Sequence, residues 1–127
     1  MIYGIGTDIV EIDRMRDAVR KWGERFLKRI FTENEISYCY GKKDPFPHLA
    51  ARFAAKESFI KAFNPDRGIA GLKDIEILNE PAGKPFINPG GALLKSCAID
   101  GPLIIHLTMT HERNHAVATV ILERKAE

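Results

Sequence analysis

The segment Leu49–Phe63, with the sequence LAARFAAKESFIKAF, constrains the fold of this 127-residue chain more than any other stretch. Nearly all of its residues are common in helix interiors, and it contains neither glycine nor proline. At 100° per residue, Leu49, Phe53, Ile60 and Phe63 fall on one stripe, and alanines cover most of the remaining surface. The pattern therefore predicts a long helix that is buried on more than one face.

Two charged residues, Glu57 and Lys61, interrupt this apolar helix one turn apart. Burying a charge costs several kcal/mol unless the charge is paired or holds a metal. The spacing by itself favours an ordinary i,i+4 ion pair, worth roughly a few tenths of a kcal/mol. A role in binding a metal or a phosphate is the alternative, and the rest of the chain bears on that choice.

The length and composition predict one soluble globular domain, residues 1–127, because 45% of the residues are hydrophobic and 28% are charged. No apolar run approaches the roughly 18 residues that a membrane span needs. The first ten residues lack the features of a signal peptide, so we expect a cytoplasmic protein. Cys39 and Cys97 are too few for a disulfide framework and are predicted to be free thiols.

The alternation of apolar and polar residues predicts an α+β fold, in which an antiparallel sheet packs against one long helix. The predicted strands are residues 1–12, 74–78, 84–87, 103–109 and 115–122. The predicted helices are residues 13–22, with Asp13 as cap and Gly23 as interruption, 24–31, 32–40 behind a Thr32–Glu35 capping box, 49–63 and 90–98. Residues 41–48 are predicted to be an exposed loop, and residues 67–71 (RGIAG) a glycine-containing loop, either a plain connector or a lining for phosphate.

The carboxylates of Asp8 and Glu57 are both set in apolar elements. A strand-end turn or a helix cap is the more common role for a residue such as Asp8, but magnesium is often held by one or two carboxylates plus substrate phosphates. Lys61 could neutralise phosphate charge, and His111 could add a hydrogen bond. A zinc site at His106, His111 and His115 would need further ligands that the sequence does not supply.

Residues 4–12 (GIGTDIVEI) and 52–62 (RFAAKESFIKA) closely resemble the two signature motifs of the holo-[acyl-carrier-protein] synthase family. This family is the small, single-domain branch of the 4′-phosphopantetheinyl transferases. The Gly83-Lys84-Pro85 turn and the stretch from Thr108 to His111 also resemble it. Serines are usual where this chain has Thr108 and Thr110, and the hydroxyl is retained.

The resemblance implies an enzyme that moves the 4′-phosphopantetheine arm of coenzyme A onto a serine of apo acyl carrier protein, in support of fatty acid biosynthesis. It implies Mg²⁺ as cofactor, Asp8 and Glu57 as its ligands, and Lys61 beside the pyrophosphate as a third catalytic residue. For the proton acceptor we expect Glu57, directly or through a metal-bound water, with Asp8 as the alternative. The implied coenzyme A-binding residues are Arg52, Lys61, Gly83, Lys84, Pro85, Thr110 and His111. The resemblance further implies a homotrimer with each site between neighbouring subunits.

Residues 14–29 hold seven basic and two acidic residues, a net charge of +5, whereas the whole chain is only +2. This face is either simply solvated or a docking site for an acidic carrier protein, and the docking hypothesis uses Arg14, Arg20, Lys21 and Arg25. An RNA-binding module is a rival hypothesis, although Trp22 and Phe26 are the only aromatics there and both are predicted to be core. A second rival hypothesis is a metal-dependent phosphohydrolase that uses water as the nucleophile. Because the aromatics of the basic segment are predicted to be core and no apolar run is long enough to span a membrane, we expect neither nucleic acid nor a membrane as a partner.

Overall fold

The computed structural model describes residues 1–64, 71–98 and 101–125, and its elements confirm the predicted α+β class. In chain order they are β1 (Ile2–Glu11), α1 (Ile12–Ile30), α2 (Glu33–Tyr40), α3 (Pro45–Phe63), the 3₁₀ helix η1 (Leu72–Asp74), β2 (Ile75–Asn79), β3 (Pro85–Pro89), α4 (Gly91–Ala98), β4 (Leu103–His111) and β5 (His115–Arg124). Of the predicted RGIAG loop, residues 67–70 lie outside the described residues.

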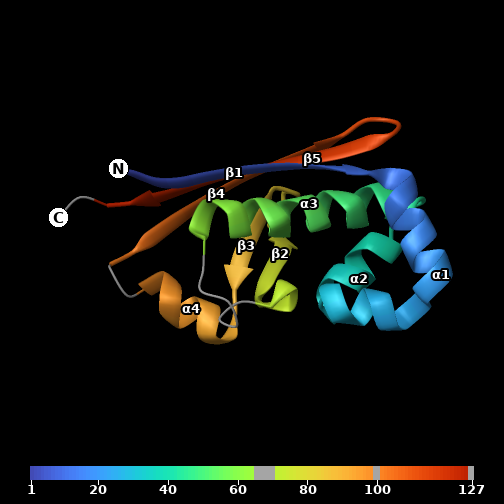
Figure 1. Ribbon diagram of the computed structural model, residues 1–127, viewed down its shortest axis with the longest axis horizontal. Helices are drawn as coiled ribbons and strands as arrows, with labels where there is room; N and C mark the ends of the chain where they lie inside the picture. Colours follow the sequence, from blue (N-terminus) through green and yellow to red (C-terminus); the bar gives the residue numbers. More distant parts are fainter. Residues whose placement is uncertain (65–70, 99–100, 126–127) are drawn as a thin grey trace.

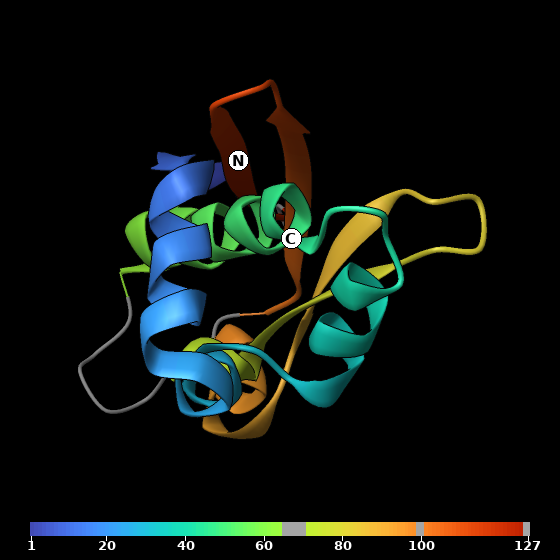
Figure 2. The ribbon, with the colours of Figure 1, turned by 90° about the vertical axis from the view of Figure 1, so that its right-hand side faces the viewer.

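The strands form two antiparallel sheets rather than the single sheet expected from the sequence. One sheet has the order β1-β5-β4, and the other is the β2–β3 hairpin. Helix α3 runs along one face of the three-stranded sheet, with the hairpin on its far side (Figure 1). Helix α1 is as long as α3 but is broken at Gly23, whose φ of 64° is left-handed, so α3 is not the only long helix. Figure 2 shows the β2–β3 hairpin projecting to one side of the molecule.

Two glycines in β1 allow that strand to lie directly on the backbone of α3. A Cβ atom added to Gly4 would lie 1.9 Å from the carbonyl oxygen of Ala62, and one added to Gly6 would lie 1.9 Å from that of Ser58. No other residue could be accommodated at these positions without displacing the helix. The close approach brings Asp8, which faces the same side of β1, to the surface of α3.

The core confirms that α3 is buried on more than one face. Three of its alanines and Phe59 pack under the three-stranded sheet (the alanines are Ala54, Ala55 and Ala62). Leu49, Ala50 and Ala51 belong to a second cluster, with residues of α1 and α2. Two charged side chains of α3, Arg52 and Lys56, are also buried. Their burial was not predicted from the sequence.

Several element boundaries differ from the prediction for local reasons. Helix α3 begins at Pro45, so the second half of the predicted 41–48 loop is helical. The Asp44 side chain caps this helix by accepting a hydrogen bond from the Phe46 amide at 3.1 Å, and proline is well tolerated in the first turn. Helix α1 begins at Ile12 after Glu11, so Asp13 lies in its first turn and is not its cap.

Other local predictions are confirmed or need only small corrections. The capping box is present, with the Thr32 hydroxyl and the Glu35 carboxylate each accepting a hydrogen bond from the other residue's amide. Strand β4 extends to His111, so the turn before β5 is shorter than predicted. Both cysteines are free and buried. No helix in the described parts of the chain is both long enough and apolar enough to cross a bilayer.

Candidate active site

Lys61 on α3 pairs with Asp8 on β1, and not with Glu57 as helical spacing alone would favour. Its Nζ donates to Oδ1 of Asp8 at 3.1 Å and to the carbonyl oxygen of Thr7 at 2.9 Å. Within the described residues, Lys61 forms no salt bridge with Glu57. Since the lysine reaches across to the strand, it joins the two signature motifs at one point of the surface.

Glu57 on α3 lies within electrostatic range of both of these residues. Partial burial and then repulsion from Asp8 raise the pKa of the Glu57 carboxyl, whereas Lys61 offsets part of this effect. The two carboxylates predicted to act together therefore lie near enough to repel each other, although they come from different elements. A pair of carboxylates that repel each other beside a single lysine is a favourable place for a further cation.

The donor set of Asp8 and Glu57 fits Mg²⁺ better than a metal that needs a full cage of protein ligands. Magnesium takes oxygen ligands and usually keeps several waters, so two carboxylates are sufficient. The described residues contain no group of three or more His, Cys, Asp or Glu side chains that could hold a metal. Of the three histidines weighed for zinc, His106 pairs with Glu123 at 3.0 Å and His115 with Glu112 at 2.9 Å.

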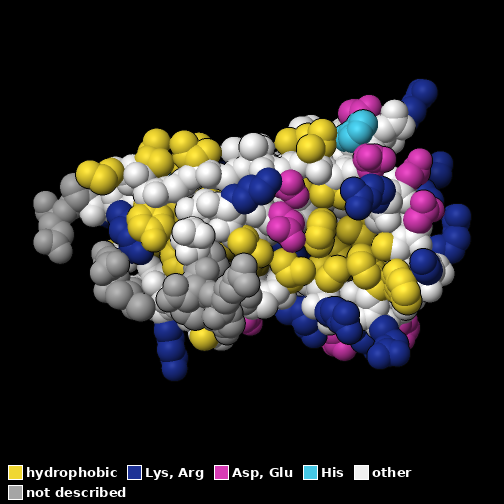
Figure 3. All heavy atoms as spheres, viewed as in Figure 1, with side chains coloured by type: hydrophobic (Ala, Val, Ile, Leu, Met, Phe, Trp, Pro, Cys, Tyr) yellow, Lys and Arg dark blue, Asp and Glu magenta, His cyan; other side chains and the backbone are white. Residues whose placement is uncertain are grey.

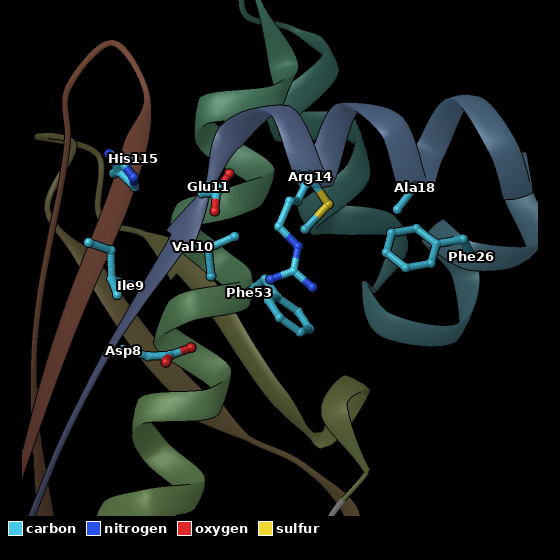
Figure 4. Close-up of a pocket in the computed structure, with 10 residues that line it drawn as sticks. Asp8, Ile9, Val10, Glu11, Arg14, Ala18, Phe26, Phe53 and His115 are labelled. Atoms are coloured by element: carbon cyan, nitrogen blue, oxygen red, sulfur yellow. The ribbon is translucent and has the colours of Figure 1, made fainter.

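A groove of about 540 Å³ begins at Asp8 and continues along α1. We call it the Asp8 groove; its lining residues are Asp8, Ile9, Val10, Glu11, Arg14, Met15, Ala18, Phe26, Phe53 and His115. Figure 4 shows Arg14 extending from α1 toward the ring of Phe53, with Asp8 at one end and Phe26 at the other. The apolar floor contributed by Phe26 and Phe53 was not predicted, because nothing in the sequence indicates that α1 and α3 leave a gap there.

The four basic residues predicted to dock a carrier protein are all exposed on α1. Arg14, Arg20, Lys21 and Arg25 form no salt bridge within the described part of the chain, whereas Arg16 is held by Asp44 at 3.1 Å. The face shown in Figure 3 carries a band of hydrophobic side chains, with Lys and Arg side chains below and to its right. Trp22 is 60% exposed, so its predicted place in the core is wrong.

A second, smaller pocket of about 150 Å³ unites residues from three distant parts of the sequence. We call it the Arg52 pocket; it is lined by Tyr38, His48, Ala51, Arg52, Asn79, Gly83, Pro85, Met109, Thr110 and His111. Five of these, Arg52, Gly83, Pro85, Thr110 and His111, were predicted as coenzyme A-binding residues. Lys61 and Lys84 were predicted with them but do not line this pocket; Lys84 is exposed in the turn after β2.

The Arg52 pocket is electropositive. The guanidinium of Arg52 lies 4.4 Å from the ring centre of Tyr38, and the rings of His48 and His111 pack edge to face at 5.5 Å. Burial, together with the charges of Arg52, His111 and Lys42, lowers the pKa of His48, while Asp44 acts weakly in the opposite direction. Arg52, His48 and His111 line the pocket and no carboxylate of the described residues does, so the pocket is suited to an anionic ligand. Tyr38, His48 and Asn79 were missed because His48 was assigned to a loop and the other two carry no motif.

The geometry defines a site with a carboxylate pair, a lysine and a basic pocket, and comparison with known proteins identifies its class. Residues 4–120 match the model of the 4′-phosphopantetheinyl transferase superfamily. A holo-[acyl-carrier-protein] synthase of Syntrophus aciditrophicus is 44% identical over 124 residues, which cover 97% of both chains.

Two solved structures are similar over nearly the whole chain. The Neisseria meningitidis holo-[acyl-carrier-protein] synthase has a TM-score of 0.89 at 38% identity, covering 98% of this chain and 100% of that one. The Bacillus anthracis enzyme, in complex with CoA (3′,5′-ADP), has a TM-score of 0.80 at 36% identity, covering 98% and 99%.

The chain therefore belongs to the 4′-phosphopantetheinyl transferase superfamily, and within it to the holo-[acyl-carrier-protein] synthase family of enzymes. This confirms the resemblance drawn from residues 4–12 and 52–62. Membership of this family also argues against the two rival hypotheses, the RNA-binding module and the phosphohydrolase.

Proposed function

We propose that this enzyme transfers the 4′-phosphopantetheine arm of coenzyme A to a serine of apo acyl carrier protein and releases adenosine 3′,5′-bisphosphate. The observation that carries the proposal is the Lys61–Asp8 ion pair, with Glu57 in electrostatic range of both residues, at the Asp8 end of a groove that runs along the basic helix α1. Family membership supports the same reaction. We assign it to fatty acid biosynthesis in the cytoplasm.

Asp8 and Glu57 are the residues that would hold Mg²⁺, with waters and phosphate oxygens as the remaining ligands. When bound, the ion would withdraw charge from the pyrophosphate of coenzyme A and so ease departure of the adenosine bisphosphate. The fit rests on the mutual repulsion of two carboxylates that the fold holds together.

The protein groups act on a reaction that exchanges one phosphorus–oxygen bond for another. The serine oxygen of the carrier attacks the phosphorus next to the pantetheine, and the bond from that phosphorus to the bridging oxygen breaks. The serine proton passes to a carboxylate, for which we propose Glu57, either directly or through a bound water; Asp8 is the alternative. Lys61 stabilises the charge that develops on the leaving phosphate.

The proposed reaction is tested by incubating the enzyme with coenzyme A, Mg²⁺ and an apo acyl carrier protein. The carrier should gain about 340 Da, the mass of the arm, as measured by mass spectrometry. Turnover of coenzyme A without any carrier would instead favour the phosphohydrolase. Absence of the mass gain with several apo carriers would contradict the proposal.

Lys61→Ala should lower kcat more than it raises the KM for coenzyme A, because we assign the lysine to charge that appears only in the transition state. Steady-state kinetics at saturating carrier measure the two constants separately. A change confined to KM would make Lys61 a ground-state binding contact. Lys95→Ala on α4 is a suitable control, because Lys95 is exposed and lines neither the Asp8 groove nor the Arg52 pocket.

Arg14→Glu should raise the KM for the carrier protein while leaving that for coenzyme A nearly unchanged. Arg14 lies in the Asp8 groove, and the basic face of α1 offers an acidic partner complementary charge, which mainly raises the association rate. The wild-type KM for the carrier should also rise as salt increases from about 0.05 M to about 0.3 M, where the screening length falls to about 6 Å. Equal effects on both substrates would indicate damage to the carboxylate pair instead.

We also propose that the active form is a homotrimer with sites between subunits. Two observations support this: the Asp8 groove and the Arg52 pocket share no lining residue, and Ile5 and Ile9 of β1 are each about 60% exposed on the outer face of the sheet. A second copy could bring one chain's pocket to another chain's carboxylates and cover the exposed isoleucines. Sedimentation equilibrium of active enzyme should give three times the 14.3 kDa chain mass; a monomer would refute the trimer.

A further inference from the structure

Asn79, the last residue of β2, uses both ends of its side-chain amide. Its Oδ1 accepts a hydrogen bond from Nη2 of Arg52 at 2.7 Å, and its Nδ2 donates to the carbonyl oxygen of Gly83 at 2.9 Å. Arginine can only donate and a carbonyl can only accept, so the orientation of the amide is fixed. Asn79 therefore joins α3 to the turn between β2 and β3.

The Arg52 side chain is only 2% exposed and depends on this contact for its orientation. Besides the bond to Asn79, it donates from Nη1 to the carbonyl oxygen of His48 at 3.2 Å and stacks on Tyr38. Its Nε is buried and has no hydrogen-bond partner among the residues that the structure describes. A buried donor without a partner is costly, and beside a pocket it is a place where a ligand can gain a hydrogen bond.

The turn at the other end of Asn79 contributes Gly83 to the lining of the Arg52 pocket. Gly83 has a φ of 100°, which favours glycine, and its amide donates to the Glu80 carbonyl oxygen at 2.7 Å. Among the described contacts, the hydrogen bond from Asn79 is the only one that a side chain makes to this turn. Asn79 thus sets the distance between Arg52 and the Gly83 turn.

We propose that Asn79 is a positioning residue, which holds Arg52 and the Gly83 turn at the spacing that an anionic group of coenzyme A requires. The inference rests on the proposed function, since it takes coenzyme A as the ligand of the Arg52 pocket. Asn79 acts through these two neighbours, so its removal affects binding of coenzyme A and leaves the carboxylate pair and the basic face of α1 unchanged.

Isothermal titration calorimetry measures directly how strongly each variant binds coenzyme A. Asn79→Ala should weaken binding about tenfold, the order expected for losing one hydrogen bond to a charged group. The KM for coenzyme A should rise accordingly, with kcat and the KM for the carrier close to wild type. Asn88→Ala is the matched control: this asparagine is on the same hairpin and donates to Glu76 at 3.4 Å, away from the pocket. It should bind coenzyme A as the wild type does.

Asn79→Asp separates positioning from simple structural support. The carboxylate retains an acceptor for Arg52, so the melting temperature should stay at or above that of Asn79→Ala. Binding of coenzyme A should nevertheless be weakened at least as much, because the new negative charge neutralises Arg52 and opposes an anionic ligand. Binding restored to the wild-type level by Asn79→Asp would overturn the proposal.

A double-mutant cycle tests whether Asn79 acts through its neighbour. In an Arg52→Lys background, Asn79→Ala should weaken binding less than about twofold further, because contacting residues that act together are not additive. Full additivity, or equal binding by the Asn79→Ala and Asn88→Ala variants, would overturn the inference while leaving the proposed function intact. A wild-type enzyme that does not bind coenzyme A would overturn the proposed function itself.

Discussion

Glu57→Gln and Asp8→Asn are each expected to lower the rate of arm transfer by at least roughly a hundredfold. Each substitution removes one negative charge from the proposed magnesium site while keeping the shape of the side chain. Turnover measured by mass spectrometry across a range of Mg²⁺ concentrations, including limiting ones, reports the effect. Near-normal turnover of either variant at limiting Mg²⁺ would show that the substituted residue is not a magnesium ligand.

The same two variants should remain folded, and Glu57→Gln should be at least as stable as the wild type near pH 7. Burial and repulsion from Asp8 raise the pKa of Glu57, so folding disfavours its ionised form. The resulting loss of stability is present above the folded-state pKa and disappears as the pH falls below the unfolded-state pKa. Thermal melts at pH 7 test this, and Glu33→Gln, an exposed carboxylate in the first turn of α2, is the matched control. A Glu57→Gln variant that melts well below the control would point to a structural role.

Lys56→Met is expected to cause the largest loss of stability, about 3 to 5 kcal/mol, or roughly 10 to 20 °C in melting temperature. The Lys56 Nζ donates to Glu35 at 2.9 Å and to the carbonyl oxygens of Leu72 and Ile75, each at 2.8 Å. Both side chains of the pair are fully buried. Burial lowers the pKa of Lys56, and Glu35 opposes that effect. Removing the lysine leaves a buried carboxylate and two carbonyl groups without their partner.

Chemical denaturation of Lys56→Met, compared with that of two other variants, tests whether loss of the buried Lys56–Glu35 pair causes the loss of stability. Lys28→Met removes a lysine from an exposed pair with Glu24, 3.7 Å apart, and should change the free energy of unfolding by less than about 1 kcal/mol. Adding Glu35→Gln to Lys56→Met should recover part of the loss, because the buried charge is removed while the side chain can still accept the Ile77 amide. A Lys56→Met variant that melts within a few degrees of the wild type would contradict the assigned role of the pair.

The sequence by itself determined most of the local structure and the family. The glycine break at Gly23, the Thr32–Glu35 capping box and the buried helix of alanines depend on residues close together in the chain, and all three are present. The two signature motifs also single out Asp8 and Glu57, which lie on different elements. At the start of α3 the predicted loop is wrong, although Asp44 followed by Pro45 is a capping signal that the sequence contains.

Only the tertiary structure decided which charges meet. Helical spacing pairs Lys61 with Glu57, but the lysine reaches Asp8, 53 residues away, because Gly4 and Gly6 let β1 lie against the helix backbone. In the same way, contacts across elements bury Lys56 on Glu35 and place Asn79 between Arg52 and Gly83. Periodicity tells which side of an element is apolar, and so it predicts the core. It carries no information about which face of another element lies opposite, and the site is made of such contacts.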